Sequence, residues 1–274
     1  MSTYTITGND KEAFENFFSP ESYNNIGRDG YYTLAETDDE DFVAGVLQFF
    51  VGEDLREGVT ANLTYIFVDE DFRGQGIGTL LINEFKGVLA DSKIKWATAE
   101  LYKDLGEELP KLLEEEGFTL EGEVDYYNVP ILKLQKSAAI KEADVSKCKT
   151  LEELSGDEIT AFLDGTGLKL DQQSLQGFDL GISSYFCEGE SKGLFLIKNN
   201  EQTLETALFY TSEGSEKEMV NLFAYSVGKA AQMYGPQSMM LITSREQLEN
   251  ELISKVAPEL SADKYLSYGY FFVD

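Results

Sequence analysis

The sequence contains no histidine. Imidazole is the usual base of Ser-His-Asp and Cys-His catalysis and a common zinc ligand, so these kinds of site are excluded. Only two cysteines occur, Cys148 and Cys187, and they lack the paired spacing of metal or redox motifs. We expect both to be reduced thiols of a cytoplasmic protein that holds no metal. Any chemistry must then use carboxylates, tyrosines, water or the backbone.

Long apolar segments and basic residues are also scarce. No run of 18 or more apolar residues occurs, and the start lacks the basic and apolar regions of a signal peptide. The 22 Lys and Arg residues stand against 50 Asp and Glu residues, which gives a formal net charge of −28. That charge repels nucleic acids and anionic membranes, and it would attract cationic amines. The sequence therefore predicts a soluble, cytoplasmic protein that binds neither nucleic acid nor membrane.

The 274 residues, 42% of them hydrophobic, are enough for two domains of ordinary size. β-rich segments alternate with segments of helical periodicity, which predicts an α/β (α+β) fold with a mixed central sheet flanked by helices. Small and polar residues at 137–150 indicate a linker between a domain at 1–136 and a domain at 151–274. Both halves have the order β-β-α-β-α-β, which favours a divergent duplication. We expect 126–136 to close the first sheet and 264–274 to form the last strand.

Three glycines interrupt the segment YIFVDEDFRGQGIGTLLINEF at residues 65–85, where a strand must become a helix. Gly74, Gly76 and Gly78 give the backbone unusual conformational freedom and let a ligand approach it closely. The first N–H groups of the following helix are unpaired within the helix, and the helix dipole adds positive partial charge. This combination predicts an anion site, with a diphosphate as its usual occupant.

The order of residues in this loop matches neither a Rossmann turn nor a P-loop. It resembles the Q/R-x-x-G-x-G/A motif of the GNAT-type N-acetyltransferases, whose wider pattern is V-x-P-x-[YF]-R-G-x-G-[IV]-G. The chain follows that pattern from Val68 to Gly78, with Glu70 in place of the proline. The element order agrees over residues 1–136, and EEEGF at 114–118 resembles the end of a family helix.

The resemblance implies a binding mode for acetyl-CoA, the acyl donor. Backbone N–H groups of the glycine loop would hold the pyrophosphate, with Arg73 at the mouth ordering the loop or reaching a phosphate. The main chain at the end of the preceding strand would pair with the pantetheine arm, beside a neighbouring strand that splays away. The residues so assigned are Phe67, Val68, Arg73, Gly74, Gln75, Gly76, Ile77, Gly78 and Thr79.

The catalytic groups depart from the family pattern. Acetyl transfer requires an amine to lose a proton, the thioester to be polarised and the thiolate to be protonated or tolerated. The family's tyrosine acid falls on Leu113, and the motif strand contains no glutamate base. We favour Tyr65 and Glu100 as substitutes, although each could instead be a packing or surface residue. Positioning alone can still supply much of the rate.

The second half lacks the glycine motif at the equivalent junction, FYTSEGSEKEMV, where Gly214 is the only glycine. Ser215 and Glu218 have the spacing of a capping box, and Glu216 adds negative charge where a diphosphate would lie. We expect a degenerate GNAT-like domain that does not bind CoA. It would either form one wall of the acceptor site or pair with the first domain of the same chain, as two subunits of a dimer do. An unrelated α+β domain is the alternative.

Three hypotheses of different classes remain open. The first is an N-acetyltransferase that acts on a small-molecule or peptide amine, as a monomer or homodimer. The second is an acyl-CoA-binding sensor that has lost turnover, for which Leu113 is the best indication. The third is a structural module that keeps only the fold. Acetyl-CoA binding and an amine screen separate them, because the sequence does not identify the amine.

Overall fold

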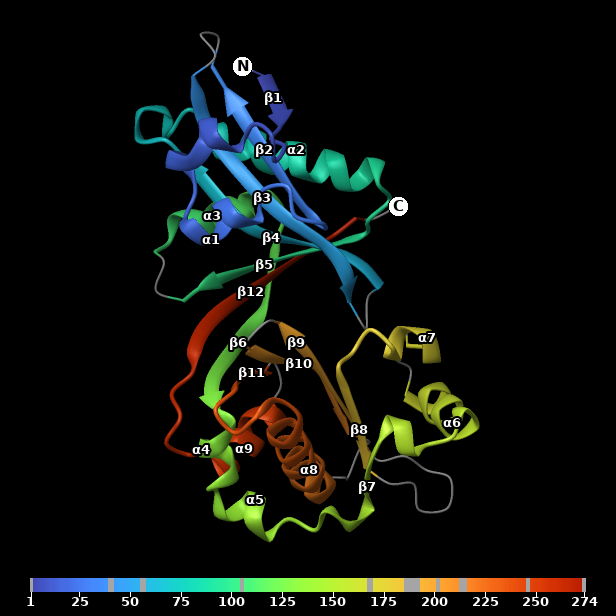
Figure 1. The fold of residues 1–274 in the computed structure, drawn as a ribbon. Coiled ribbons are helices and arrows are strands. Elements are labelled where there is room, and N and C mark those ends of the chain that lie inside the picture. Colours follow the sequence, from blue (N-terminus) through green and yellow to red (C-terminus); the bar gives the residue numbers. More distant parts are fainter. Residues whose placement is uncertain are drawn as a thin grey trace. The chain divides into compact units, whose positions relative to one another are not determined.

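The computed structural model describes residues 2–38, 42–54, 58–103, 106–166, 170–184, 193–200, 203–211, 216–244 and 247–272. Its contacts divide the chain into two compact units. The first unit consists of Met1–Glu123 and Tyr265–Asp274, and the second consists of Val124–Lys264. Figure 1 shows the elements of both units, coloured along the chain.

The first unit is built on a mixed sheet whose strands follow the order β1-β2-β3-β4-β5-β12. All neighbours are antiparallel except β4 and β5, which run parallel. These strands are β1 (Ser2–Thr5), β2 (Tyr31–Thr37), β3 (Val43–Asp54), β4 (Gly58–Val68), β5 (Trp96–Tyr102) and β12 (Asp263–Phe271). The helices of this unit are η1 (Lys11–Phe17), α1 (Pro20–Asn25), η2 (Glu70–Phe72), α2 (Ile77–Asp91) and α3 (Glu108–Glu115).

The second unit has the strand order β6-β11-β10-β9-β8-β7. Strands β10 and β11 run parallel, and the other neighbours run antiparallel. The strands are β6 (Thr119–Pro130), whose residues belong to the second unit from Val124 on, β7 (Cys148–Thr150), β8 (Leu180–Ser184), β9 (Gly193–Asn200), β10 (Thr203–Thr211) and β11 (Met239–Ser244). The helices are α4 (Ile131–Gln135), α5 (Ala138–Glu142), η3 (Val145–Lys147), η4 (Leu151–Glu153), α6 (Gly156–Thr166), α7 (Gln172–Leu175), α8 (Glu216–Tyr234) and α9 (Gln247–Val256).

The mixed α/β architecture predicted from the sequence is confirmed, but the two closing strands differ from expectation. Strand β12, from the end of the chain, pairs with β5 of the first unit, with Tyr268 opposite Ala99. Residues 125–130 of β6 pair with β11 of the second unit. Each half therefore receives its closing strand from the other half of the sequence. The local sequence cannot reveal this exchange of strands, because a β-rich segment has the same composition whichever sheet it joins.

The boundaries of the units also lie elsewhere than at 136 and 150. The segment predicted to continue as a strand to residue 136 turns into α4 after Pro130, which is the last residue of β6 and the N-cap of α4. The expected linker at 137–150 contains α5, η3 and the edge strand β7. Its residues thus belong to the folded second unit.

Two apolar clusters cover the two faces of the sheet in the first unit. One cluster joins α2 and α3 to the sheet and includes Leu47, Leu63, Leu81, Phe85, Ala99 and Leu113. The other cluster joins η1 and α1 to the opposite face and includes Phe14, Phe18, Ala35 and Val46. Alternate residues of a strand point to opposite faces, so neighbours along β2 and β3 divide between the two clusters. The second unit has its own core around α8 and α9.

Candidate functional site

The predicted glycine loop connects β4 to α2. Strand β4 ends at Val68, and the next amide, Asp69 N, donates to Ala44 O at 3.0 Å. Ala44 is an extra residue in β3, since Glu36 lies opposite Gly45 and Thr37 lies opposite Val43. This bulge presents the carbonyl that fixes the start of the loop.

Two of the three motif glycines have left-handed backbones. Gly74 has φ 75° and Gly76 has φ 81°, and a Cβ at either would meet no heavy atom within 4 Å. Gly76 is also the N-cap of α2, where no side chain accepts a hydrogen bond and no acidic residue occupies the first turn. Helix α2 therefore begins with N–H groups that no capping side chain satisfies, beside open space. This is the geometry of an anion site.

Arg73 and Gln75 hold the loop in shape. Arg73 Nε donates to Val68 O at 3.2 Å, and its Nη1 lies 3.8 Å from the carboxylate of Glu70. Gln75 Nε2 donates to Asp71 O at 2.9 Å. The sequence left two roles open for Arg73, ordering the loop or reaching a phosphate. In the structure its side chain orders the loop. The exposed pair with Glu70 contributes little to stability.

Just before this loop, β4 loses its pairing with β5, and we call its unpaired stretch Thr64–Val68 the slot. Strands β4 and β5 pair only from Thr60 opposite Trp96 to Leu63 opposite Ala99. Immediately afterwards β4 bulges, because Gln48 of β3 lies opposite Tyr65 while Phe49 lies opposite Leu63. The extra residue is Thr64, whose Oγ1 donates to Gln48 O at 3.1 Å. The last five residues of β4 thus extend past the part that β5 pairs with.

The bulge changes which side chains face which cluster. Before it, Ala61 and Leu63 belong to the α2 and α3 cluster. After it, Tyr65 and Phe67 pack on the opposite cluster, near η1 and α1. Glu100 follows Ala99, which belongs to the α2 and α3 cluster, so alternation puts Glu100 on the opposite face as well. The structure therefore places both candidate catalytic residues on one face, each just beyond the last paired position.

The side chain of Tyr65 contacts the segment that precedes α1. Its hydroxyl donates to Phe17 O at 3.0 Å, and its ring centroid lies 5.5 Å from that of Phe18. Burial raises the pKa of Tyr65, partly offset by a backbone hydrogen bond from Ser19. The phenol therefore stays protonated at neutral pH and holds this segment against β4.

Glu100 lies on β5 opposite Ser267 of β12, and it is half-buried. Leu113 of α3 is fully buried in the α2 and α3 cluster, so the position of the family's tyrosine supplies no proton donor. The structure thus leaves Glu100 as the candidate acid or base that the sequence and the fold bring to the slot.

The sequence analysis did not identify two polar residues near the slot, Gln48 and Thr64, as residues of the site. Gln48 is a single amide inside the apolar run VAGVLQFFVG, which was the available signal. Thr64 cannot be recognised as a bulge residue without the register of β3 against β4.

The second unit has a comparable interruption of strand pairing. Strands β10 and β11 pair only from Thr203 opposite Met239 to Glu205 opposite Leu241, and β10 bulges between Thr206 and Leu208. The predicted capping residue Ser215, with Gly214, lies outside the described residues. The capping box therefore stays a prediction.

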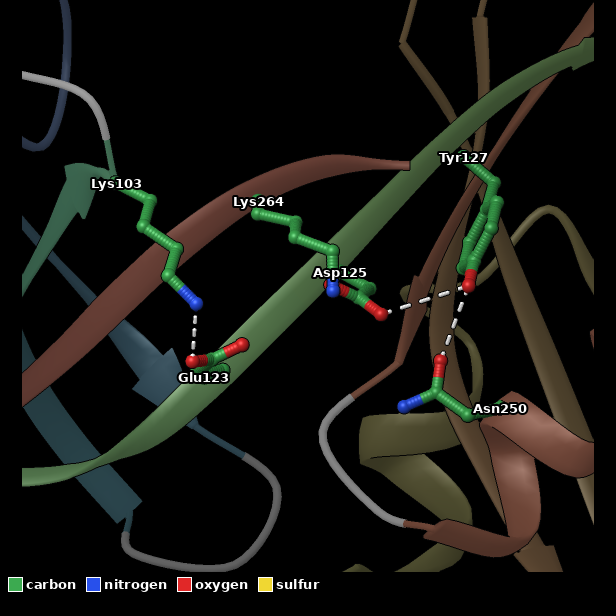
Figure 2. Close-up of polar contacts among 6 residues, drawn as sticks. All are labelled: Lys103, Glu123, Asp125, Tyr127, Asn250 and Lys264. Atoms are coloured by element: carbon green, nitrogen blue, oxygen red, sulfur yellow. Dashed lines mark hydrogen bonds and ion pairs between the residues drawn. The ribbon is translucent and has the colours of Figure 1, made fainter. Parts of the chain in front are cut away.

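Figure 2 shows polar contacts around β6. In the second unit, the hydroxyl of Tyr127 donates to Asn250 Oδ1 at 3.1 Å and lies 3.5 Å from Asp125 Oδ2. Lys264 Nζ lies 3.7 Å from Asp125 Oδ1. In the first unit, Lys103 forms an ion pair with Glu123. Burial, the charge of Asp125 and the hydrogen bond with it raise the pKa of Tyr127.

Within the described ranges, no group of three or more Cys, Asp or Glu residues is arranged to hold a metal ion. Among the helices that the structure describes, none is both long enough and apolar enough to cross a membrane.

Residues 2–106 match the model of the acetyltransferase (GNAT) family. Most of the first unit is therefore similar to a GNAT domain. The match covers the glycine loop and the bulged strand β4 with its slot, and it ends before α3. No curated protein matched the sequence.

Solved structures extend the likeness to the whole chain. A tandem GNAT protein from the clavulanic acid biosynthesis pathway is 11% identical with a TM-score of 0.58, over 100% of this chain and 99% of that chain. A probable N-acyltransferase of Enterococcus faecalis V583 is 12% identical with a TM-score of 0.51, over 98% of this chain and 72% of that chain. A fungal glucosamine N-acetyltransferase region is 10% identical with a TM-score of 0.67, over 98% of this chain and 38% of the other. The chain thus has a tandem GNAT fold.

Proposed function

We propose that this GNAT protein is an N-acetyltransferase that transfers the acetyl group of acetyl-CoA to a primary amine of a small molecule or a peptide. One observation carries the proposal: the stretch of β4 that β5 leaves unpaired is followed, across the glycine loop, by the uncapped N-terminus of α2. An extended arm that ends in a diphosphate has the shape and charge that this arrangement accommodates. The cytoplasm would supply such a donor.

The donor would lie along β4 with its pyrophosphate at the loop. Backbone N–H groups at the start of α2 would bind the phosphate oxygens, and Arg73 would keep the loop ordered while its remaining N–H groups face the anion. The pantetheine arm would pair with the main chain of Phe67 and Val68. The loop residues assigned to this role are Gln75, Gly76, Ile77, Gly78 and Thr79.

The chemistry would take place at the slot. The amine nitrogen attacks the thioester carbonyl carbon, the C–S bond breaks, and the CoA sulfur leaves as a thiolate that takes up a proton. The amine proton would pass to Glu100 directly or through water. Tyr65 would act by positioning, because its hydroxyl is bonded to Phe17 O. Holding the two reactants together supplies most of the rate in this scheme.

The second unit would serve as a non-catalytic partner that shapes the acceptor site, in a monomer or a homodimer. Its described residues keep the interrupted pairing of β10 and β11. Its charge pattern at 214–218 disfavours a diphosphate there.

A second candidate function is an acyl-CoA-binding sensor without turnover. The buried Leu113 favours it, because this position offers no acid for the leaving thiolate. Such a protein would bind acetyl-CoA and release no thiol with any amine.

Thermal unfolding with and without acetyl-CoA is the first test. A ligand at about 100 times its dissociation constant adds roughly 2.7 kcal/mol to the free energy of unfolding. Thiol release from acetyl-CoA over a panel of small amines and lysine-containing peptides then separates the enzyme from the sensor. If acetyl-CoA leaves the melting temperature unchanged, both functions fail and only the fold remains.

A further inference from the structure

Gln48 is a fully buried amide on the face of the first unit's sheet that η1 and α1 cover. Its exposed fraction is 0%, and it lies on β3 directly opposite Tyr65 of β4. Residues directly opposite on antiparallel strands point to the same face. Gln48 therefore shares the face of Tyr65 and Glu100, while α2 and α3 fill the other face.

The orientation of this amide is fixed by its donors. Gln48 Nε2 donates to Ser22 O of α1 at 3.0 Å and to Thr33 Oγ1 of β2 at 3.2 Å. A backbone carbonyl can only accept a hydrogen bond, so the nitrogen must be the atom that faces Ser22. The side-chain oxygen Oε1 then points elsewhere.

Among the described residues, no donor lies within hydrogen-bond distance of Gln48 Oε1, although the atom is buried. A buried acceptor without a partner destabilises the folded state, because it has lost its hydrogen bond to water. Such a group in a folded protein calls for an explanation, and a donor supplied by a ligand or an ordered water is one.

Gln48 also anchors the parts that form the slot. Its main-chain carbonyl accepts from Thr64 Oγ1, the extra residue of the β4 bulge. Its side chain holds Ser22 O, and the neighbouring Tyr65 holds Phe17 O. Segment 17–22 is thus held against β3 and β4 by two hydrogen bonds, which come from residues directly opposite each other.

We propose that Gln48 is a specificity-determining residue whose side-chain oxygen accepts a hydrogen bond from the ammonium or amine N–H of the acceptor. The oxygen has no donor among the described residues, and an N–H donor is the complement of such a buried acceptor. A charge-assisted hydrogen bond to a buried acceptor discriminates strongly against ligands without N–H groups. The inference rests on the proposed function, because it deepens the choice of acceptor.

The test uses the full chain labelled with ¹⁵N in its glutamine side chains. The side-chain cross-peak of Gln48 is assigned by its loss in Gln48→Met, and n-butylammonium is added as the probe. Tetramethylammonium is the control, because it has the same charge and no N–H group. We expect a saturable shift with n-butylammonium and at least about tenfold weaker binding of tetramethylammonium, which is 1.4 kcal/mol.

Gln48→Met provides the second comparison, with Thr33→Val as a variant that removes one of the partners of Nε2 and leaves Oε1 in place. We expect binding of n-butylammonium to fall at least tenfold in Gln48→Met and to persist in Thr33→Val. Equal shifts with both cations show attraction by the acidic protein alone and overturn the inference. So does a Gln48 cross-peak that neither cation moves.

Acetyl-CoA binding is measured on the same samples. Because Gln48 is not assigned to the donor, Gln48→Met is expected to keep the thermal shift with acetyl-CoA. Loss of that shift in the wild-type protein contradicts the proposed function, whereas failure of the ammonium probe alone contradicts only the role of Gln48. If Gln48→Met does not fold, the comparison of the two cations on the wild-type protein still tests the proposed role of Gln48.

Discussion

Gly78 of α2 faces Leu112 of α3 so closely that a Cβ on Gly78 would lie 2.8 Å from Leu112 Cδ2. The third glycine of the motif is therefore explained by the packing of two helices. Gly74 and Gly76 differ from it, because both have positive φ angles and face open space. A single motif thus combines two glycines that shape the loop with one that lets α3 pack beside it.

We predict that Gly76→Glu abolishes stabilisation by acetyl-CoA. The new side chain projects negative charge at the start of α2, where the proposal places a diphosphate. Gly58→Glu is the matched control, because Gly58 also has a positive φ of 85° and nothing within 4 Å of its Cβ position. Both variants lose about 1–2 kcal/mol through backbone strain. In thermal unfolding only Gly58→Glu should keep the ligand shift, and a retained shift in Gly76→Glu would falsify the assignment of the loop.

Gly45→Ala should destabilise the first unit by about 1–3 kcal/mol. A Cβ there would lie 2.9 Å from Phe67 O and 3.0 Å from Ile77 Cγ2, so β3 could no longer approach β4 and α2 as it does. Gly87→Ala in α2 is the control of opposite sign, since nothing lies within 4 Å of that position. Alanine in an exposed helix site should add up to about 1 kcal/mol. Urea unfolding measures both changes, and equal effects would contradict the packing argument.

Lys86 connects α2, α3 and β12. Its Nζ lies 3.0 Å from both the main-chain oxygen and the carboxylate of Glu116, and 5.4 Å from the ring centroid of Tyr270. The two charged side chains are only 16% and 12% exposed. Lys86→Met should cost about 1–3 kcal/mol, because it leaves the Glu116 carboxylate without its partner in a poorly solvated place.

The control for Lys86 is Lys111, whose pair with Glu115 is 75% and 62% exposed. Lys111→Met should change the free energy of unfolding by no more than about 0.5 kcal/mol. Comparable losses in the two variants would show that burial does not set the strength of these pairs.

Removal of residues 265–274 should unfold the first unit, although these residues lie at the far end of the sequence. They contain most of β12, including Tyr268, which is 2% exposed, and the partners of the whole of β5. Without them, β5 becomes an open edge and the α2 and α3 cluster is exposed. Amide hydrogen exchange of β5 in the truncated chain checks this. Protection equal to that of the full chain would show that β12 is dispensable.

Cys148 should react slowly with iodoacetamide. Burial, with a smaller contribution from Asp144, raises the pKa of its thiol from 9.0 to about 11. At pH 8 only about one thiol in a thousand is then ionised, and the thiolate is the reactive form. In the variant Cys187→Ser, Cys148 is the only cysteine. Its labelling at pH 8 should be far slower in the folded protein than in urea. Equal rates would contradict the burial of the thiol.

The same pKa shift predicts a loss of stability with alkali. The folded state binds the thiol proton more tightly than the unfolded state, so this contribution is complete below about pH 9 and disappears as the pH rises to about 11. The stability difference between the Cys148 protein and Cys148→Ala should shrink over that interval in urea unfolding. A difference that grows with pH would reverse the sign and contradict the assignment.

The sequence by itself determined the features that depend on neighbouring residues. The run from Val68 to Gly78 specified a strand, a glycine loop and an uncapped helix, because backbone freedom and helix capping are local properties. The absence of histidine excluded whole classes of mechanism without any structure. The alternation of strands and helices specified the mixed α/β architecture.

Only the tertiary structure decided which strands close the sheets, because β6 and β12 pair with partners far away in the sequence. It also decided the role of Tyr65, since the Thr64 bulge turns Tyr65 to the α1 face and gives its hydroxyl to Phe17 O. Gln48 became visible for the same reason: its unpaired oxygen depends on where α1 and β2 lie. Register and packing between distant segments are non-local, so a local pattern does not contain them.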